Sequence, residues 1–179
     1  MTTEEVIDLL GTTVLSATFS DRGLKYLSLK PDQGSQNIDL DKAGKGEAGS
    51  FANQVYQETV KFLKSGKHDM PLDLSAFTAF QQEVFKAVGQ VEPGTVVTYK
   101  DVAIGLGKPG GAQAVGSAIT KNPVSYFLPT HRVLPQKGIG ICRTGAGHLR
   151  EKLLAREGHD LSQLRGNYVC TREKCIYLE

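Results

Sequence analysis

The segment 99–123, YKDVAIGLGKPGGAQAVGSAITKNP, contains two short helical patterns separated by a turn rich in glycine and proline. Thr98 directly precedes the first pattern and is a suitable N-cap for a helix. The second pattern ends at Asn122 and Pro123, because proline cannot continue a helix. Two short helices joined by such a turn are the outline of a helix-turn-helix, a motif that binds DNA.

The second of these helices has mostly small side chains, at Gly111, Ala112, Ala114, Gly116, Ser117 and Ala118. Glycine inside a helix costs about 1 kcal/mol relative to alanine, so these residues need an explanation. One explanation is close packing against another helix. The other is a close approach of the helix backbone to a nucleic-acid groove, where bulky side chains would hold the helix away.

The rest of the chain divides into local patterns. Residues 12–30 alternate around a Ser-Asp-Arg-Gly turn and predict a β-hairpin, and residues 31–50 predict a loop. Ser50 is the expected N-cap of a helix that ends at Gly66, and residues 67–75 resemble a linker. A further helix is predicted after the linker from apolar residues at helical spacing, Phe77, Phe80, Val84, Phe85 and Val88.

Composition bounds the class of protein. The 179 residues are 40% hydrophobic and 22% charged, which is typical of a globular chain. Residues 1–70 carry a net charge of −2 and residues 71–179 carry +4, so we expect a polyanion to dock on the second half. No segment has the ~18 consecutive apolar residues of a membrane helix, and the acidic N-terminus is unlike a secretory signal.

The segment 128–133, LPTHRV, brings together a hydroxyl group, an imidazole ring and a guanidinium group. Together with FQQEVFKAVGQVEPGTVVTYKDVA, AVGSAITKNP and LREKLLAREG, which occur in this order, it resembles the DNA-binding domain of O6-alkylguanine-DNA alkyltransferases. The resemblance runs from about Phe77 to Gly158. It implies an α/β N-terminal domain (1–70), a mainly α domain with a winged helix-turn-helix and an alkyl pocket (76–160), and a C-terminal tail (161–179).

The resemblance also implies a chemistry. Members of that family bind the minor groove, flip a damaged guanine into a pocket and transfer its alkyl group irreversibly to a cysteine in a Pro-Cys-His-Arg-Val motif. Here Thr130 stands in place of that cysteine. His131 matches the histidine that acts as a base through a water, Glu157 matches the glutamate behind it, and Asn122 matches the hinge between recognition helix and pocket.

A threonine hydroxyl is a much weaker acid than a thiol, whose pKa is near 8.5, and its methyl group crowds the approach. We therefore expect that Thr130 does not accept alkyl groups and that the protein senses lesions or shapes DNA. An alternative is an active or inactivated O6-methylguanine-DNA methyltransferase, with Cys142 as a displaced acceptor. A Thr-His-Glu hydrolase is a third interpretation, for which the sequence offers no oxyanion hole.

Several residues match family positions that contact DNA or the substrate, namely Tyr99, Lys100, Lys108, Gly111, Ala112, Gln113, Gly116 and Gln136. Gln113 stands where the family usually has an arginine that enters the duplex, so we expect weaker assistance to base flipping. At the family's pocket tyrosine the chain has Arg143, followed by Thr144 and Gly145, so the rim of the pocket has changed.

No cofactor or metal is indicated. The chain has no phosphate-binding loop or dinucleotide fingerprint, and its three cysteines, Cys142, Cys170 and Cys175, lack the spacing of a metal site. Their odd number favours a reducing compartment. The expected partner is double-stranded DNA, alkylated or not, with an unknown repair protein as a further candidate and no membrane. The expected location is the nucleus of a eukaryote, or otherwise the cytoplasm and nucleoid.

Overall fold

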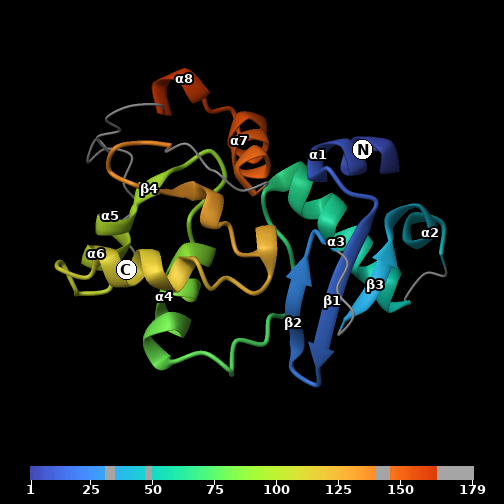
Figure 1. Ribbon diagram of the computed structural model, residues 1–179, viewed down its shortest axis with the longest axis horizontal. Coiled ribbons are helices and arrows are strands. Elements are labelled where there is room, and N and C mark those ends of the chain that lie inside the picture. Colours follow the sequence, from blue (N-terminus) through green and yellow to red (C-terminus); the bar gives the residue numbers. More distant parts are fainter. Residues whose placement is uncertain (31–34, 47–49, 140–145, 165–179) are drawn as a thin grey trace. The chain divides into compact units, whose positions relative to one another are not determined.

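The computed structural model describes residues 1–30, 35–46, 50–139 and 146–164 (Figure 1). The chain forms two compact units. The first contains residues 1–76 together with 123–127, and the second contains residues 77–122 and the described residues from 128 onward. The inclusion of the five residues 123–127 in the first unit was not indicated by the sequence.

The first unit contains a three-stranded sheet. Its strands are β1 (Val14–Ser20), β2 (Gly23–Ser28) and β3 (Gln36–Asp39). β1 lies in the centre and pairs antiparallel with both neighbours, and a bulge follows Thr18 in its pairing with β2. The hairpin predicted over residues 12–30 is confirmed.

Three helices accompany this sheet, α1 (Thr3–Leu10), α2 (Leu40–Lys45) and α3 (Phe51–Ser65). The prediction for α3 is confirmed at both ends, because Ser50 caps its start and Gly66 ends it with a φ of 69°. The loop predicted over 31–50 is wrong for residues 36–45, which form β3 and α2. Pairing with β1 selects the strand, and the side chain of Asp39 then accepts from Lys42 N to cap α2.

The segment predicted as a linker, 67–75, is fastened to the edge of the sheet. Leu24 N donates to Pro71 O over 2.8 Å, and Asp73 N donates to Leu24 O over 2.9 Å. The carboxylate of Asp73 accepts from Ser20 Oγ and from the backbone of Ser75, and these bonds lower its pKa to about 2. This end of the first unit is therefore ordered by hydrogen bonds and not a free connection.

The second unit is mainly helical. Its elements are α4 (Ala79–Gly89), β4 (Val97–Thr98), α5 (Tyr99–Gly105), α6 (Ala112–Ile119), the 3-10 helix η2 (Thr130–Arg132), β5 (Val133–Leu134), α7 (Ala146–Arg156) and α8 (Leu161–Leu164). The helices predicted from periodicity in this half are confirmed as α4, α5 and α6. Thr78 and Thr98 cap α4 and α5 as capping boxes, with Gln81 and Asp101 as the returning side chains.

Two apolar clusters hold the second unit together. The first joins α4, α5 and α6, and its members include Val84, Val88, Val102, Ala103, Val115 and Ile119. The second joins β5, α7 and α8 through Leu134, Leu154 and Leu164. Leu164 O also accepts from Ile139 N over 2.7 Å. The first residues of the predicted tail are thus part of the folded unit, and residues 165–179 lie outside the described residues.

A short parallel pairing links the second half of the unit to the start of α5. Val97 pairs with Val133, and Thr98 pairs with Leu134. Since Thr98 also caps α5, the chain that follows Thr130 is hydrogen-bonded to the residue that starts this helix. No local pattern of residues indicated this two-residue pairing.

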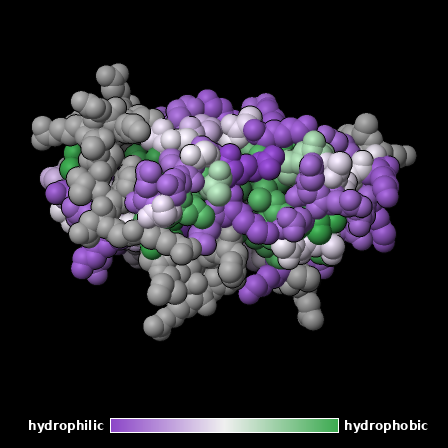
Figure 2. Space-filling view, turned by 90° about the horizontal axis from the view of Figure 1, so that it is seen from above, coloured by the Kyte–Doolittle hydropathy of each residue, from purple (hydrophilic) through white to green (hydrophobic). Residues whose placement is uncertain are grey.

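The surface is mostly hydrophilic on the face shown in Figure 2, with small hydrophobic areas between. Among the described residues, Ile104 on α5 is the exposed large hydrophobic side chain, at 44% exposure. Within the same residues no helix has the length and apolar character that crossing a membrane requires.

Candidate functional site

Thr130, His131 and Arg132 form the single turn η2 that leads directly into β5. Thr130 is half-buried, whereas His131 and Arg132 are buried at 5% and 2% exposure. The backbone N–H of Thr130 donates to Leu128 O over 2.6 Å. The turn therefore brings the hydroxyl-bearing residue nearest to solvent and places the two nitrogen-bearing side chains behind it.

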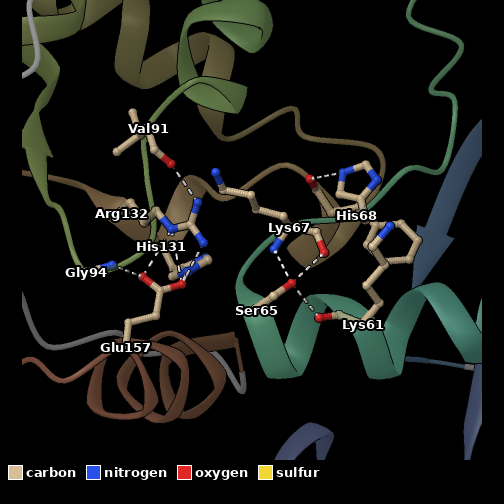
Figure 3. A network of polar contacts seen from close by, with 10 residues as sticks. Lys61, Ser65, Lys67, His68, Val91, Gly94, His131, Arg132 and Glu157 are labelled. Carbon is tan, nitrogen blue, oxygen red and sulfur yellow. Dashed lines mark hydrogen bonds and ion pairs between the residues drawn. The ribbon is translucent and has the colours of Figure 1, made fainter.

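Glu157, which directly follows α7, accepts hydrogen bonds from both buried side chains (Figure 3). His131 Nε2 lies 3.0 Å from Glu157 Oε1. Arg132 Nε lies 3.1 Å from each carboxylate oxygen, and another guanidinium nitrogen lies 2.7 Å from Oε1. The pair predicted from the resemblance, His131 and Glu157, is thus in direct contact.

Arg132 and Glu157 also bind the backbone of the segment between α4 and β4 (Figure 3). The guanidinium group donates to Val91 O over 2.6 Å, and Gly94 N donates to Glu157 Oε2 over 3.3 Å. Gly94 has a φ of 78°, a conformation that favours glycine. These contacts fasten η2, α7 and the 91–94 segment to one another.

The ionisation of the pair follows from its surroundings. Burial by itself would raise the pKa of Glu157, but the hydrogen bonds from His131 and Arg132, together with the charge of the Arg132 guanidinium group, outweigh burial and lower the pKa to about 2. Burial lowers the pKa of His131 below its ordinary value, although the hydrogen bond to Glu157 acts in the opposite direction. At neutral pH the site therefore holds an ionised carboxylate and a neutral imidazole.

This assignment fixes which imidazole nitrogen carries the proton. An ionised carboxylate only accepts hydrogen bonds, so Nε2 of His131 must be the N–H donor to Glu157. In a neutral ring the other nitrogen, Nδ1, is then the basic one. The arrangement supplies a general base of modest strength whose tautomer is set by the carboxylate behind it.

Asn122, which precedes η2 in the sequence, is hydrogen-bonded to the segment that leads into this turn. Its side-chain nitrogen Nδ2 donates to Leu128 O over 3.4 Å, and this carbonyl oxygen also accepts from Thr130 N. The residue predicted as a hinge therefore shares a hydrogen-bond acceptor with the backbone of Thr130.

The small residues of α6 and its N-cap fall into two groups: packing explains the small size of some of them and not of others. Gly111 is the N-cap, where a Cβ would lie 2.9 Å from Lys108 O, and Ala118 is buried in the core of the unit. These two are explained by local packing. At Gly116 a Cβ would lie 3.8 Å from the ring of Tyr99, which is ordinary contact, and Ser117 is exposed. Packing within the described residues does not require glycine at 116.

The remaining residues predicted to contact DNA lie on the surface of the same unit. Lys100, Gln113 and Gln136 are exposed, while Tyr99 and Ala112 are half-buried. Their side chains are accessible in the unit, as contact with a duplex requires, and their roles stay predictions.

Lys108 has partners that the sequence did not indicate. Its Nζ lies 3.0 Å from Glu83 Oε2 on α4 and 5.6 Å from the centre of the Phe80 ring. A phosphate group would therefore have to compete with the carboxylate of Glu83 for this lysine.

The predicted rim of the pocket, Arg143, Thr144 and Gly145, lies outside the described residues, as does Cys142. The sequence had also left the role of Arg132 open. Its bonds to Glu157 and Val91 join residues 25 and 41 positions away, so no local pattern could have revealed them.

Comparison with known proteins identifies the family. Residues 79–159 match the model of the 6-O-methylguanine DNA methyltransferase DNA-binding domain. The methylated-DNA–protein-cysteine methyltransferase of Mycobacterium leprae is 34% identical over 116 residues, which are 64% of this chain and 70% of that protein. This chain belongs to the methylated-DNA–protein-cysteine methyltransferase family.

Other relatives of the same name match over a shorter stretch. That of Metallosphaera sedula is 41% identical over 50% of this chain and 55% of its own length, and that of Salmonella typhimurium is 40% identical over 46% and 48%. The chain thus spans about half the length of these curated relatives. The structure of Mycobacterium tuberculosis OGT in complex with DNA is 27% identical, with a TM-score of 0.58 over 79% of this chain and 87% of that one.

Proposed function

We propose that this member of the methyltransferase family binds duplex DNA and receives a flipped, alkylated guanine without accepting its alkyl group. One observation carries the proposal. Thr130 is half-buried and directly precedes His131, which bonds Glu157, at the position where the resemblance puts the acceptor cysteine. The protein would then recognise O6-alkylguanine lesions, and repair would need another factor.

The chemistry of the two side chains supports this role. A thiol with a pKa near 8.5 is converted to the nucleophilic thiolate by a base such as neutral His131. An aliphatic hydroxyl is a far weaker acid, and activated Ser or Thr residues attack carbonyl or phosphoryl groups. Dealkylation requires attack on a saturated carbon, for which a neutral hydroxyl is a poor nucleophile. His131 can therefore serve as a base, but the hydroxyl oxygen of Thr130 is a poor acceptor for an alkyl group.

The surface of the second unit supports the DNA-binding half of the proposal. α4, α5 and α6 share one apolar core, and the exposed side of α6 carries the uncharged side chains of Gln113, Ala114 and Ser117. Such a helix can approach the floor of a minor groove closely. Lys100 and Lys108 would pair with phosphates, and the similar OGT of Mycobacterium tuberculosis has a crystal structure in complex with DNA.

Equilibrium binding tests the proposal. Two duplexes of identical sequence, with guanine or O6-methylguanine at one position, are titrated at several salt concentrations. We expect binding to both, tighter binding to the modified duplex, and a linear fall of log K with log salt from the phosphate contacts. Equal affinities would discard lesion recognition, and the lack of any salt-dependent binding would discard the DNA-binding role.

The intact network behind Thr130 favours a second candidate, a methyltransferase inactivated at this one position. Thr130→Cys separates it from the first proposal, because the His131–Glu157 pair would be available to activate a thiol introduced next to it in the sequence. Transfer of a labelled methyl group to the variant would show that position 130 alone blocks the reaction. No transfer would indicate that Gln113 and the changed pocket rim also matter.

A further inference from the structure

The five residues 123–127, which we name the strap, leave the second unit after Asn122 and return to it at Leu128. Their contacts belong to the first unit, where residues 125–127 form a 3-10 turn, η1, beside β2 (Figure 1). The strap lies between the end of α6 and Thr130 in the sequence. The strap is therefore followed in the chain by Leu128 and Pro129, which lead into η2.

The backbone of the strap is held at both ends by residues of the first unit. Leu27 N, on β2, donates to Pro123 O over 2.8 Å. His68 Nε2 lies 2.8 Å from Phe127 O, and because a carbonyl only accepts, Nε2 carries the proton (Figure 3). The His68 ring also stacks on the Phe127 ring, with centroids 4.6 Å apart.

The side chain of Tyr126 is held by a relay of hydroxyl groups. Thr59 Oγ1 donates its single proton to Val55 O over 2.7 Å. Tyr126 OH lies 2.9 Å from Thr59 Oγ1 and must therefore be the donor in that bond. Thr59 and Tyr126 are buried, at 0% and 2% exposure. Removing the Thr59 oxygen would deprive a buried phenol of this acceptor, which is costly.

The backbone of the strap has an unfavourable conformation at its centre. Ser125 has a φ of 46°, and among the described residues it is the non-glycine residue with a positive φ. Such a conformation persists only where the surroundings impose it, and it concentrates at functional sites. The bonds at Pro123, Tyr126 and Phe127 are the constraints that flank it on both sides.

Leu128 connects the constrained strap to the candidate site. Leu128, the first residue after the strap, provides the carbonyl oxygen that accepts from both Thr130 N and Asn122 Nδ2. A shift of the Phe127 backbone would displace this shared acceptor, and with it the start of η2.

We propose that Thr59, His68 and Tyr126 in the first unit are positioning residues for Thr130, which act by holding the strap. Thr59 and His68, which lie outside the matched DNA-binding domain, would thus tune how a flipped base is received. The inference deepens the proposed function and rests on it for its DNA readout, whereas a second readout is independent of DNA.

The independent readout uses Thr130→Cys as a probe. The rate at which iodoacetamide modifies the introduced thiol is followed against pH by peptide mass spectrometry, which separates it from the three natural cysteines. Adding Thr59→Val should change this rate by roughly threefold to tenfold, the size of coupling within one hydrogen-bond network, while Thr59→Ser, which keeps the oxygen, should leave it unchanged. Identical pH-rate profiles for all three proteins would overturn the inference.

The DNA readout is the ratio of affinities for modified and unmodified duplexes. In the natural Thr130 background, Thr59→Val and Tyr126→Phe should each lower this ratio, and Thr59→Ser should keep it. Measurements are made below the thermal transition of every variant, and Tyr126→Phe replaces Thr59→Val if the latter does not fold. If the wild type binds no DNA, the proposed function fails. The pH-rate profile of the introduced thiol still tests the inference about the strap in that case. If the wild type discriminates and both variants discriminate equally, the strap inference fails.

Discussion

The network behind Thr130 and the exposed side of α6 are two regions of one unit with opposite character. The network buries three ionisable side chains, His131, Arg132 and Glu157, which bind one another and the backbone. α6 has no charged residue in its first or last turn and no side-chain cap. Stability alone would be enough to explain the network, because it fastens three segments together. Packing among the described residues does not explain glycine at 116, so this helix supports the DNA-binding part of the proposal.

The largest expected effect is the loss of the buried ion pair. Arg132→Leu leaves the Glu157 carboxylate buried without its bidentate partner, and we expect the free energy of unfolding to fall by about 3–5 kcal/mol. Chemical denaturation measures it. Lys61→Met, which removes the exposed ion pair with Asp69, is the control and should be close to wild type. Equal, small losses in both variants would show that the network does not stabilise the fold.

The second effect concerns pH. Burial lowers the pKa of His131 and of His68 in the folded state, so below pH ~6.5 the unfolded chain takes up protons first. The free energy of unfolding should therefore fall as pH drops from about 6.5 through the folded pKa values. Glu157 adds a loss only at lower pH, between its ordinary pKa of 4.5 and about 2. Denaturant titrations from pH 8 to pH 5 that gave constant stability would contradict the neutral state of the two imidazoles.

A third prediction separates packing from binding at α6. Gly116→Ala should raise the free energy of unfolding by about 0.5–1 kcal/mol, since alanine favours a helix interior and the space beside Tyr99 admits a methyl group. Affinity for duplex DNA should fall severalfold because the methyl group separates the helix from the groove. Gly89→Ala, in α4 and in open space, is the matched control with no effect on binding. Unchanged affinity of the Gly116 variant would favour packing as the only role of the small residues.

The smallest expected effect tests Lys108. Glu83→Gln removes the carboxylate that holds this lysine, so DNA affinity should rise about twofold to threefold at low salt. The slope of log K against log salt should become steeper by up to ~0.9, the contribution of one phosphate contact. A fall in affinity, or an unchanged slope, would place Lys108 outside the DNA contact.

Local signals decided which parts of the fold the sequence could predict. The caps at Ser50, Gly66 and Thr98, with apolar spacing between them, were enough for α3 and α5. β3 and α2 were missed because strand formation at 36–39 depends on pairing with β1. α1 also went unpredicted, although Thr2 and Glu5 form its capping box. This capping pattern is a local signal that predicts the helix.

In the candidate site, too, contacts between residues far apart in the sequence had no local signal. His131 and Glu157 were expected together only through the resemblance to a family, because 26 residues separate them. The resemblance did not indicate that Arg132 binds the same carboxylate, or that Glu83 holds Lys108. The first pair depends on how η2 lies beside the end of α7, and the second on how the segment between α5 and α6 lies beside α4. Side-chain partners of this kind follow from the tertiary structure and not from residue spacing.

The proposal that Thr130 accepts no alkyl group is tested by the mass of the wild-type protein after incubation with a duplex that carries isotopically labelled O6-methylguanine. An active methyltransferase run in parallel confirms that the duplex is a substrate. We predict that the peptide containing Thr130 keeps its mass while the protein still binds the duplex. A labelled methyl group on Thr130 would contradict the proposal, and one on Cys142 would identify the displaced acceptor instead.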